Sequence, residues 1–163
     1  MSKKTNNPST LQNPRIPVQV KLAAAWTSFM FLYIYVDILS FYKPGVVDGI
    51  MAGVVFEFDI SSTLLTVFLV SVSIPAIMVW LSMTLPAQMN RATNLIVASL
   101  LIPYSVVNAA GESWDWAAFY GISIGLEVLL LAFILRSAWT WPRTSSTSTP
   151  DLVALHNAAE PDR

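Results

Sequence analysis

Residues 26–42 read WTSFMFLYIYVDILSFY, and this stretch decides the fold of the chain. The segment is apolar enough to lie in lipid, yet it contains Tyr33, Tyr35 and Asp37 within the hydrophobic run. Tyr33 and Asp37 are four residues apart, so a helix brings both side chains to one face. An ionisable group inside a membrane-spanning helix is costly, and its presence there therefore indicates a functional site.

The composition is typical of a membrane protein. Of the 163 residues, 55% are hydrophobic and 12% are charged, against roughly 25% charged in an ordinary soluble domain. The length is that of a single domain. The formal net charge is −1 and there is no basic block, so we expect no nucleic-acid partner. The lipid bilayer is the partner that this composition predicts.

The residues needed for most kinds of catalysis are missing from the sequence. There is no cysteine, and the single histidine, His156, lies in a polar C-terminal tail. Thiol chemistry, thiolate metal sites, serine–histidine catalysis and histidine metal clusters are therefore not expected. We predict no cofactor, no metal site and no catalytic residue. An intramembrane enzyme that uses two carboxyl groups as acid and base is the least favoured function.

The hydrophobic runs predict an all-α integral membrane protein. The expected fold is a four-helix bundle whose spans cover about residues 21–42, 60–85, 93–110 and 117–139. Such lengths suit a hydrocarbon core of ~30 Å at 1.5 Å per helical residue. Residues 1–17 and 143–163 are polar, and we expect a disordered leader and a disordered tail on either side of a membrane domain at 18–142.

The connections between the spans contain typical helix boundaries. Lys43-Pro44-Gly45 ends the first span, because proline cannot continue a helix. Residues 46–59 are too short to cross a bilayer and contain three acidic residues, which predicts a short extracytoplasmic surface segment, either helix or loop. Ser61 or Ser62 can cap the second span. Polar residues 87–93 predict a tight turn before the third.

The basic residues gather on one side of the predicted bundle. Four spans place both termini on the same side, which also receives the loop between the second and third spans. That side carries Lys3, Lys4, Arg15, Lys21, Arg91, Arg136 and Arg143. The other side has Lys43 alone among the basic residues near the spans. The positive-inside rule therefore predicts cytoplasmic termini and insertion in the cell inner (plasma) membrane.

Five polar side chains are predicted to lie within the membrane. Counting along the helices at 1.5 Å per residue places Asp37, Tyr104 and Asn108 in the outer half, with Tyr33 and Glu127 below them. We predict that these five residues line an intramembrane pocket that holds a proton, a cation or a small polar ligand.

Two other roles for the chain stay open. The polar groups could instead join the helices by hydrogen bonds, which contribute only ~0.6 kcal/mol each on average in a membrane protein. A buried carboxyl group is a costly way to make such a bond, which favours the pocket for Asp37 and Glu127. A carrier with only four spans would need a homodimer. The alternative function is that of a structural or accessory subunit that docks a partner through its helix faces.

The cytoplasmic start of the third span contains a further polar group, Asn90, Arg91 and Asn94. Its position near the membrane surface suggests ordinary roles in capping the helix and contacting lipid phosphates. Trp80, Trp139 and Trp141 are expected to anchor the helices at the interface.

Several pieces of the chain match one family pattern when they are taken together. They are Tyr33-Ile-Tyr35-Val-Asp37, Ile74-Pro75-Ala76-Ile77-Met78, Leu81-Ser82, Asn90-Arg91-Ala92-Thr93-Asn94, Glu127 and Ala138-Trp139-Thr140-Trp141. Their order and spacing resemble an uncharacterised bacterial family of small four-span membrane proteins, described as a domain of unknown function. The resemblance covers about residues 18–142 and implies the fold without an activity. In that family the position of Ser73 is often glutamate. A looser architectural similarity is to DoxX-like proteins.

Overall fold

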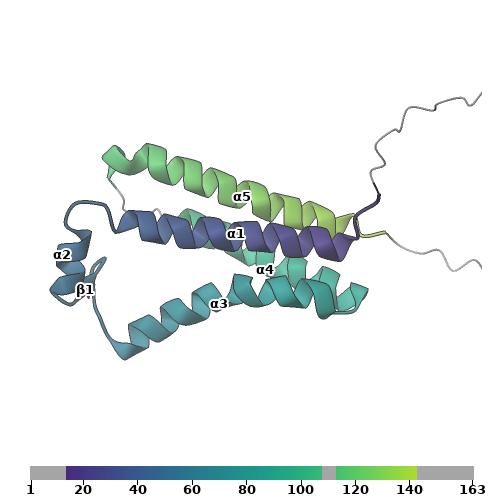
Figure 1. Cartoon of the computed structure of the whole chain (residues 1–163), viewed down its shortest axis with the longest axis horizontal. Helices are drawn as coiled ribbons and strands as arrows, with labels where there is room; N and C mark the ends of the chain where they lie inside the picture. The colour runs from purple at the N-terminus through teal and green to yellow at the C-terminus, as the bar shows by residue number, and fades with distance from the viewer. Residues whose placement is uncertain (1–13, 108–112, 143–163) are drawn as a thin grey trace, which may run out of the picture.

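Long helices make up most of the structure. The computed structural model describes residues 14–107 and 113–142. Four long helices lie side by side (Figure 1), namely α1 (Val18–Ser40), α3 (Ser62–Thr84), α4 (Ala87–Val107) and α5 (Ala117–Trp139). A short 3-10 helix, η1 (Trp114–Trp116), leads into α5. Helix α1 packs against α3 and α5, α5 also packs against α4, and α3 and α4 contact each other far less.

Three of these stretches are long and apolar enough to cross a membrane. They are Val18–Ser40, Ser62–Thr84 and Trp114–Trp139. Each agrees with a predicted span to within a few residues. Helix α4 is not in this group, because its first two turns carry Gln88, Asn90, Arg91 and Asn94.

The predicted turn at residues 87–93 is wrong. These residues form the first turns of α4, which follows Pro86 directly. The backbone N–H of Asn90 donates to the Pro86 carbonyl at 2.9 Å, so the helical hydrogen bonds begin at the proline. The polar sequence resembles that of a loop, but the side-chain amides of Asn90 and Asn94 point into the protein interior. At the start of α3 the predicted serine cap is present, since the backbone N–H of Leu64 donates to the Ser61 hydroxyl at 3.2 Å.

The segment between α1 and α3 forms a small folded unit. It contains α2 (Val46–Met51) and an antiparallel hairpin of β1 (Val54–Val55) and β2 (Phe58–Asp59). Gly45 and Gly53 have φ values of 82° and 85°, which glycine adopts without steric cost. The sequence predicted a helix or a loop here and did not predict the hairpin, because strands of two residues show no periodicity.

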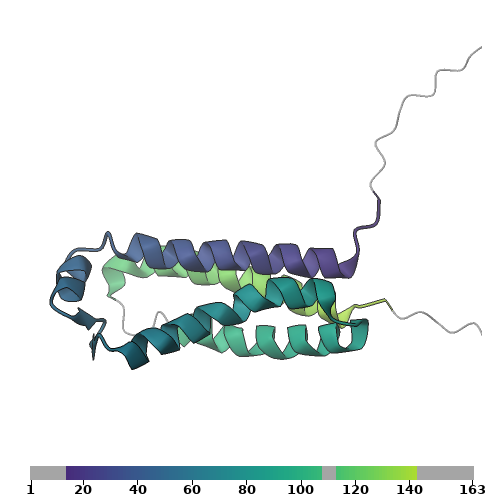
Figure 2. The same cartoon turned by 60° about the horizontal axis from the view of Figure 1, so that its bottom comes forward.

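The two ends of the molecule differ in what they contain. The start of α1, the end of α5 and the connection from α3 to α4 lie together at one end (Figures 1 and 2). The α2 and hairpin unit lies at the opposite end. Residues 14–17 form neither helix nor strand. The predicted disorder of the two tails otherwise concerns residues 1–13 and 143–163, which lie outside the described part.

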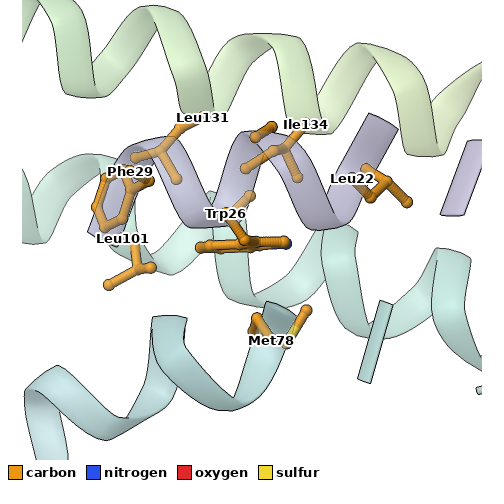
Figure 3. Packing of buried hydrophobic residues seen from close by; sticks show 9 residues of the cluster. Leu22, Trp26, Phe29, Met78, Leu101, Leu131 and Ile134 are labelled. Carbon is orange, nitrogen blue, oxygen red and sulfur yellow. The ribbon is translucent and has the colours of Figure 1, made fainter. Parts of the chain in front are cut away.

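The buried apolar core lies in the half of the molecule near the chain ends. Trp26 occupies its centre, between Leu131 and Ile134 of α5 and Met78 of α3 (Figure 3). Phe29 meets the Trp26 ring edge-on, with centroids 5.9 Å apart. Burial of large side chains from all four long helices therefore fixes their packing at this end.

A buried hydrogen-bond network crosses the same core. The Trp26 indole N–H donates to the Asn94 side-chain oxygen at 2.6 Å. The Asn94 amide donates to the backbone carbonyl and the side-chain oxygen of Asn90 at 2.8 and 2.7 Å. The Asn90 amide donates to the Ser82 carbonyl at 2.6 Å, and the Ser82 hydroxyl approaches Asn94 at 3.4 Å. The network thus joins α1, α3 and α4.

This network corrects the expectation for the start of the third span. Asn90 and Asn94 are completely buried, so neither contacts lipid phosphates. They face inward because they lie four residues apart, on one side of α4. Arg91 lies between them in sequence and points elsewhere, with its guanidinium 5.6 Å from the centre of the Trp139 ring.

We expect Asn94→Leu to lower the free energy of unfolding by about 2 kcal/mol, since the substitution removes four hydrogen bonds at ~0.6 kcal/mol each. Equilibrium unfolding in mixed micelles measures the change. Ser99→Leu, an exposed position on the same helix, is the control and should stay within about 0.5 kcal/mol of the native protein. Equal stabilities for the two variants would contradict the structural role of the network.

Candidate functional site

A cavity of about 410 Å³ lies in the half of the molecule away from the chain ends. Figure 1 shows α3 bending away from α1 as it approaches the hairpin, and Figure 2 shows the same divergence. Pro75 lies inside α3, and its missing N–H removes one helical hydrogen bond and permits a bend. The space that opens is lined by α1, α3, α4 and α5, and by residues of α2 and the hairpin at its outer end.

The walls of the cavity are largely apolar. Val36 of α1, Phe68 and Val72 of α3 and Ile124 of α5 line its sides, and Phe56 closes on it from the hairpin. Phe56 has a positive φ of 55°, which is uncommon for a bulky side chain. The hairpin turn therefore keeps an aromatic residue at the mouth at some conformational cost.

Four of the five predicted site residues line this one cavity. Tyr33 and Asp37 come from α1, Tyr104 from α4 and Glu127 from α5. Asn108, the fifth, lies outside the described residues. The two carboxyl groups therefore belong to a single cavity, although they come from different helices.

Five further polar residues line the cavity and were not among the predicted site residues. They are Ser40, Ser71, Ser105, Tyr120 and Ser123. A sequence signal for two of them exists, since Ser123 and Tyr120 precede Glu127 by four and seven residues and so share its helix face. Ser105 follows Tyr104 directly. Its inward direction depends on the rotation of α4, which helix periodicity alone does not reveal.

The floor of the cavity is a pair of tyrosines. The hydroxyl groups of Tyr33 and Tyr104 are 3.1 Å apart, joining α1 to α4 by a hydrogen bond. The Tyr33 ring also stacks on Phe29, with centroids 6.1 Å apart. Because Phe29 belongs to the apolar core, the tyrosine pair marks the boundary between the close-packed half of the molecule and the cavity.

Glu127 and Ser105 are both buried at the cavity wall, and the Ser105 hydroxyl has no hydrogen-bond partner of good geometry among the described residues. Their exposed fractions are 5% and 1%. The Ser105 hydroxyl faces the Glu127 carboxyl, but no described protein atom completes a hydrogen bond of good geometry with it. Asp37 is more open and lies close enough to Glu127 for their charges to interact. Buried polar groups normally find partners, so an unsatisfied hydroxyl beside a buried carboxyl group marks a place where a bound molecule can supply a hydrogen bond.

Lys43 is the basic residue nearest to this cavity among the described residues. Its ammonium group donates a hydrogen bond to the Tyr120 hydroxyl at 3.1 Å. The same group lies 4.9 Å from the centre of the Tyr120 ring and 5.5 Å from that of Trp116. Tyr120 lines the cavity, whereas Lys43 is not among the lining residues.

The fold and the cavity define a mostly helical protein with helices long and apolar enough to cross a membrane. The chain belongs to the Family of unknown function (DUF6326), whose family model matches residues 17–145. This confirms membership of a domain-of-unknown-function family, and the matched range is close to the predicted domain at 18–142. Comparisons with curated proteins and with solved structures find no match.

A structural role and a binding role for Glu127 predict different stabilities. We expect Glu127→Leu to keep or raise the free energy of unfolding, by up to about 2 kcal/mol, because the substitution removes a carboxyl group that is buried at the cavity wall and costly to desolvate. Unfolding in mixed micelles measures this. Leu131→Ala, one turn further along the same helix face, should by contrast cost about 2–5 kcal/mol. A loss above 2 kcal/mol for Glu127→Leu would mean that the carboxyl holds the helices together.

Proposed function

We propose that this chain is a multi-pass protein of the inner (plasma) membrane, which it crosses four times as a four-helix bundle with both termini in the cytoplasm. Three helices have the length and apolarity of membrane spans. Helix α4 is the fourth span, because the amides of Asn90 and Asn94 that lower its hydropathy are buried inside the protein. Its exposed side chains are largely apolar, namely Met89, Ile96, Leu100, Val106 and Val107.

The charges support the orientation of this bundle. Lys21, Arg91 and Arg136 belong to the end of the molecule at which the chain enters and leaves, and Lys43 belongs to the other end. The positive-inside rule therefore assigns the termini to the cytoplasm. The α2 and hairpin unit then forms an extracytoplasmic surface segment that covers the outer mouth of the cavity.

Topology reporters test the orientation. Green fluorescent protein fused to the C-terminus should fluoresce in a bacterial host, because it folds in the cytoplasm. Alkaline phosphatase fused after residue 59 should be active, because that enzyme matures outside the cytoplasm. An inactive phosphatase at residue 59 together with an active one at the C-terminus would reverse the proposed orientation.

The proposed function is to bind a small ligand within the membrane, in the cavity lined by Asp37 and Glu127. The observation that carries this proposal is a cavity of about 410 Å³ whose wall holds the buried Glu127 carboxyl group and a buried Ser105 hydroxyl that has no hydrogen-bond partner among the described residues. Ligand pockets are typically about 300–1,000 Å³, mostly apolar, with a few polar groups that orient the ligand. A purely structural hydrogen-bond cluster would leave neither such a volume nor such an unsatisfied hydroxyl group, as the Trp26–Asn94 network illustrates.

An accessory role is less well supported. The exposed apolar faces of the four helices are what contact with lipid requires, so they do not single out a surface for a partner protein. The cavity has no comparable explanation if the chain serves only to dock a partner.

Native mass spectrometry of the protein purified in mild detergent tests the binding function. We expect the native chain to carry a bound small molecule, and Asp37→Asn and Glu127→Gln to carry at least tenfold less of it, because each removes a carboxylate acceptor. Asp48→Asn is the control, since Asp48 is exposed on α2 and outside the cavity. Equal occupancy in all four proteins would count against the cavity. A protein partner without a small molecule would favour the accessory role.

A further inference from the structure

We propose that the ligand is a small organic cation with an apolar body, of which a protonated alkylamine is the simplest example. Its charged head would lie between Glu127 and Asp37, and its hydrocarbon would lie against the apolar walls. This inference rests on the proposed binding function and adds the chemical class of the ligand.

The sign of the ligand's charge follows from the residues that line the cavity. They include two carboxyl groups and no lysine, arginine or histidine among the described residues. Charges interact more strongly in the low-dielectric interior of a protein than in bulk water. An anion would therefore be repelled by each ionised carboxylate, while a cation would be attracted by both and would offset the cost of their burial.

Lys43 does not supply this balancing charge inside the cavity. Its ammonium group is directed to the Tyr120 hydroxyl and to the faces of two aromatic rings. Lys43 is not among the residues that line the cavity. The contact between Lys43 and the Tyr120 ring is a cation–π interaction, in which the face of an aromatic ring attracts a positive charge. Tyr33 and Tyr104, which line the cavity from the other side, can do the same for a ligand.

The size of the cavity selects an organic cation over a proton or a metal ion. A proton on Glu127 would need no volume, and about 410 Å³ would stay unexplained. A hard metal ion such as calcium takes six to eight oxygen ligands, whereas the described residues contain no group of three or more His, Cys, Asp or Glu side chains. The apolar side chains Val72, Phe68 and Ile124 instead match hydrocarbon, which gains about 25 cal/mol per Å² on burial.

The Ser105 hydroxyl and the Glu127 carboxylate favour a ligand whose head group carries N–H bonds. The Ser105 hydroxyl oxygen has no partner, and the adjacent Glu127 carboxylate can only accept hydrogen bonds when ionised. A primary ammonium group offers three donors and can satisfy both residues at once. A quaternary ammonium ion has no N–H and would leave them unpaired. We therefore expect a primary amine to bind more tightly than its trimethylated analogue.

The absence of cysteine from the sequence allows a direct test with a single introduced thiol. Ser123→Cys places the thiol in the cavity wall, where Ser123 is 5% exposed. Three methanethiosulfonate reagents are compared, which carry an aminoethyl cation, a sulfonatoethyl anion or a smaller, neutral methyl group. Each transfers its thioalkyl group to the thiolate and releases methanesulfinate. Ser113→Cys, exposed and outside the cavity, provides the reference rates.

We expect the ratio of cationic to anionic labelling rates to be at least tenfold higher at position 123 than at position 113. Adding Glu127→Gln to Ser123→Cys should reduce that ratio at least fivefold, because it removes one negative charge from the cavity. Hexylamine at millimolar concentration should slow labelling at position 123, whereas hexanoate and hexyltrimethylammonium should slow it less. Ser71→Cys, on the α3 wall of the same cavity, replaces Ser123→Cys if the latter does not elute as a folded protein.

The outcomes separate the two proposals. If the neutral reagent reacts at position 123 and the anionic reagent reacts as fast as the cationic one, the cation proposal is overturned and the binding function stands. If no reagent reacts at either cavity position, the cavity is closed to small molecules and the binding function fails with it. A cation preference that Glu127→Gln and Asp37→Asn both leave unchanged would remove the assignment of the charged head to these carboxylates.

Discussion

The hydrogen bond from the Trp26 indole to the Asn94 amide, 2.6 Å long, is the contact on which the arrangement of the helices depends. Helix α1 packs mainly on α3 and α5, and α4 packs mainly on α5, so Trp26 crosses the centre of the molecule to reach α4. The Asn94 amide donates hydrogen bonds to Asn90, and the Asn90 amide donates one to the Ser82 carbonyl on α3. One chain of polar groups therefore fastens α1, α3 and α4 at the end where the large side chains pack.

The open arrangement of the helices at the opposite end follows from this hydrogen-bond network. With the helices held together on the side of the chain ends, α3, which contains Pro75, diverges from α1 toward the hairpin (Figure 1). The Tyr33–Tyr104 hydrogen bond marks the level at which close packing stops. Beyond it the helices enclose space rather than fill it. The α2 and hairpin unit spans the gap, because the chain must cross from the end of α1 to the start of the divergent α3.

The two halves of the molecule differ in whether their buried polar groups have hydrogen-bond partners. Asn90, Asn94 and Ser82 are fully buried and satisfy one another, so they stabilise one packing of the helices. Glu127 and Ser105 are almost as deeply buried, but the Ser105 hydroxyl has no hydrogen-bond partner among the described residues. A satisfied network specifies structure, whereas an unsatisfied buried group carries a cost that a ligand can relieve. This contrast, more than the presence of carboxyl groups, distinguishes the candidate site from the core.

Helix periodicity explains how much of the site could be predicted from the sequence. Tyr33 and Asp37 share a helix face by spacing alone, and the hydropathy of their segment made them conspicuous. The same spacing connects Ser123 with Glu127, but a serine in a membrane helix is ordinary and gives no signal by itself. The start of α4 was predicted as a turn because its residues are polar, and composition does not distinguish polar residues that face water from those that face a buried indole.

The sequence by itself determined the helical class, three membrane-length helices and the pair of carboxyl groups within them, because hydropathy and helical spacing are local properties of the chain. Only the tertiary structure decided that Asp37 and Glu127 line one cavity and that Asn90 and Asn94 belong to the core. Both outcomes depend on how α4 and α5 are rotated about their axes. That rotation is set by side-chain packing between segments such as Trp26 and Asn94, which are 68 residues apart, and no local pattern encodes it.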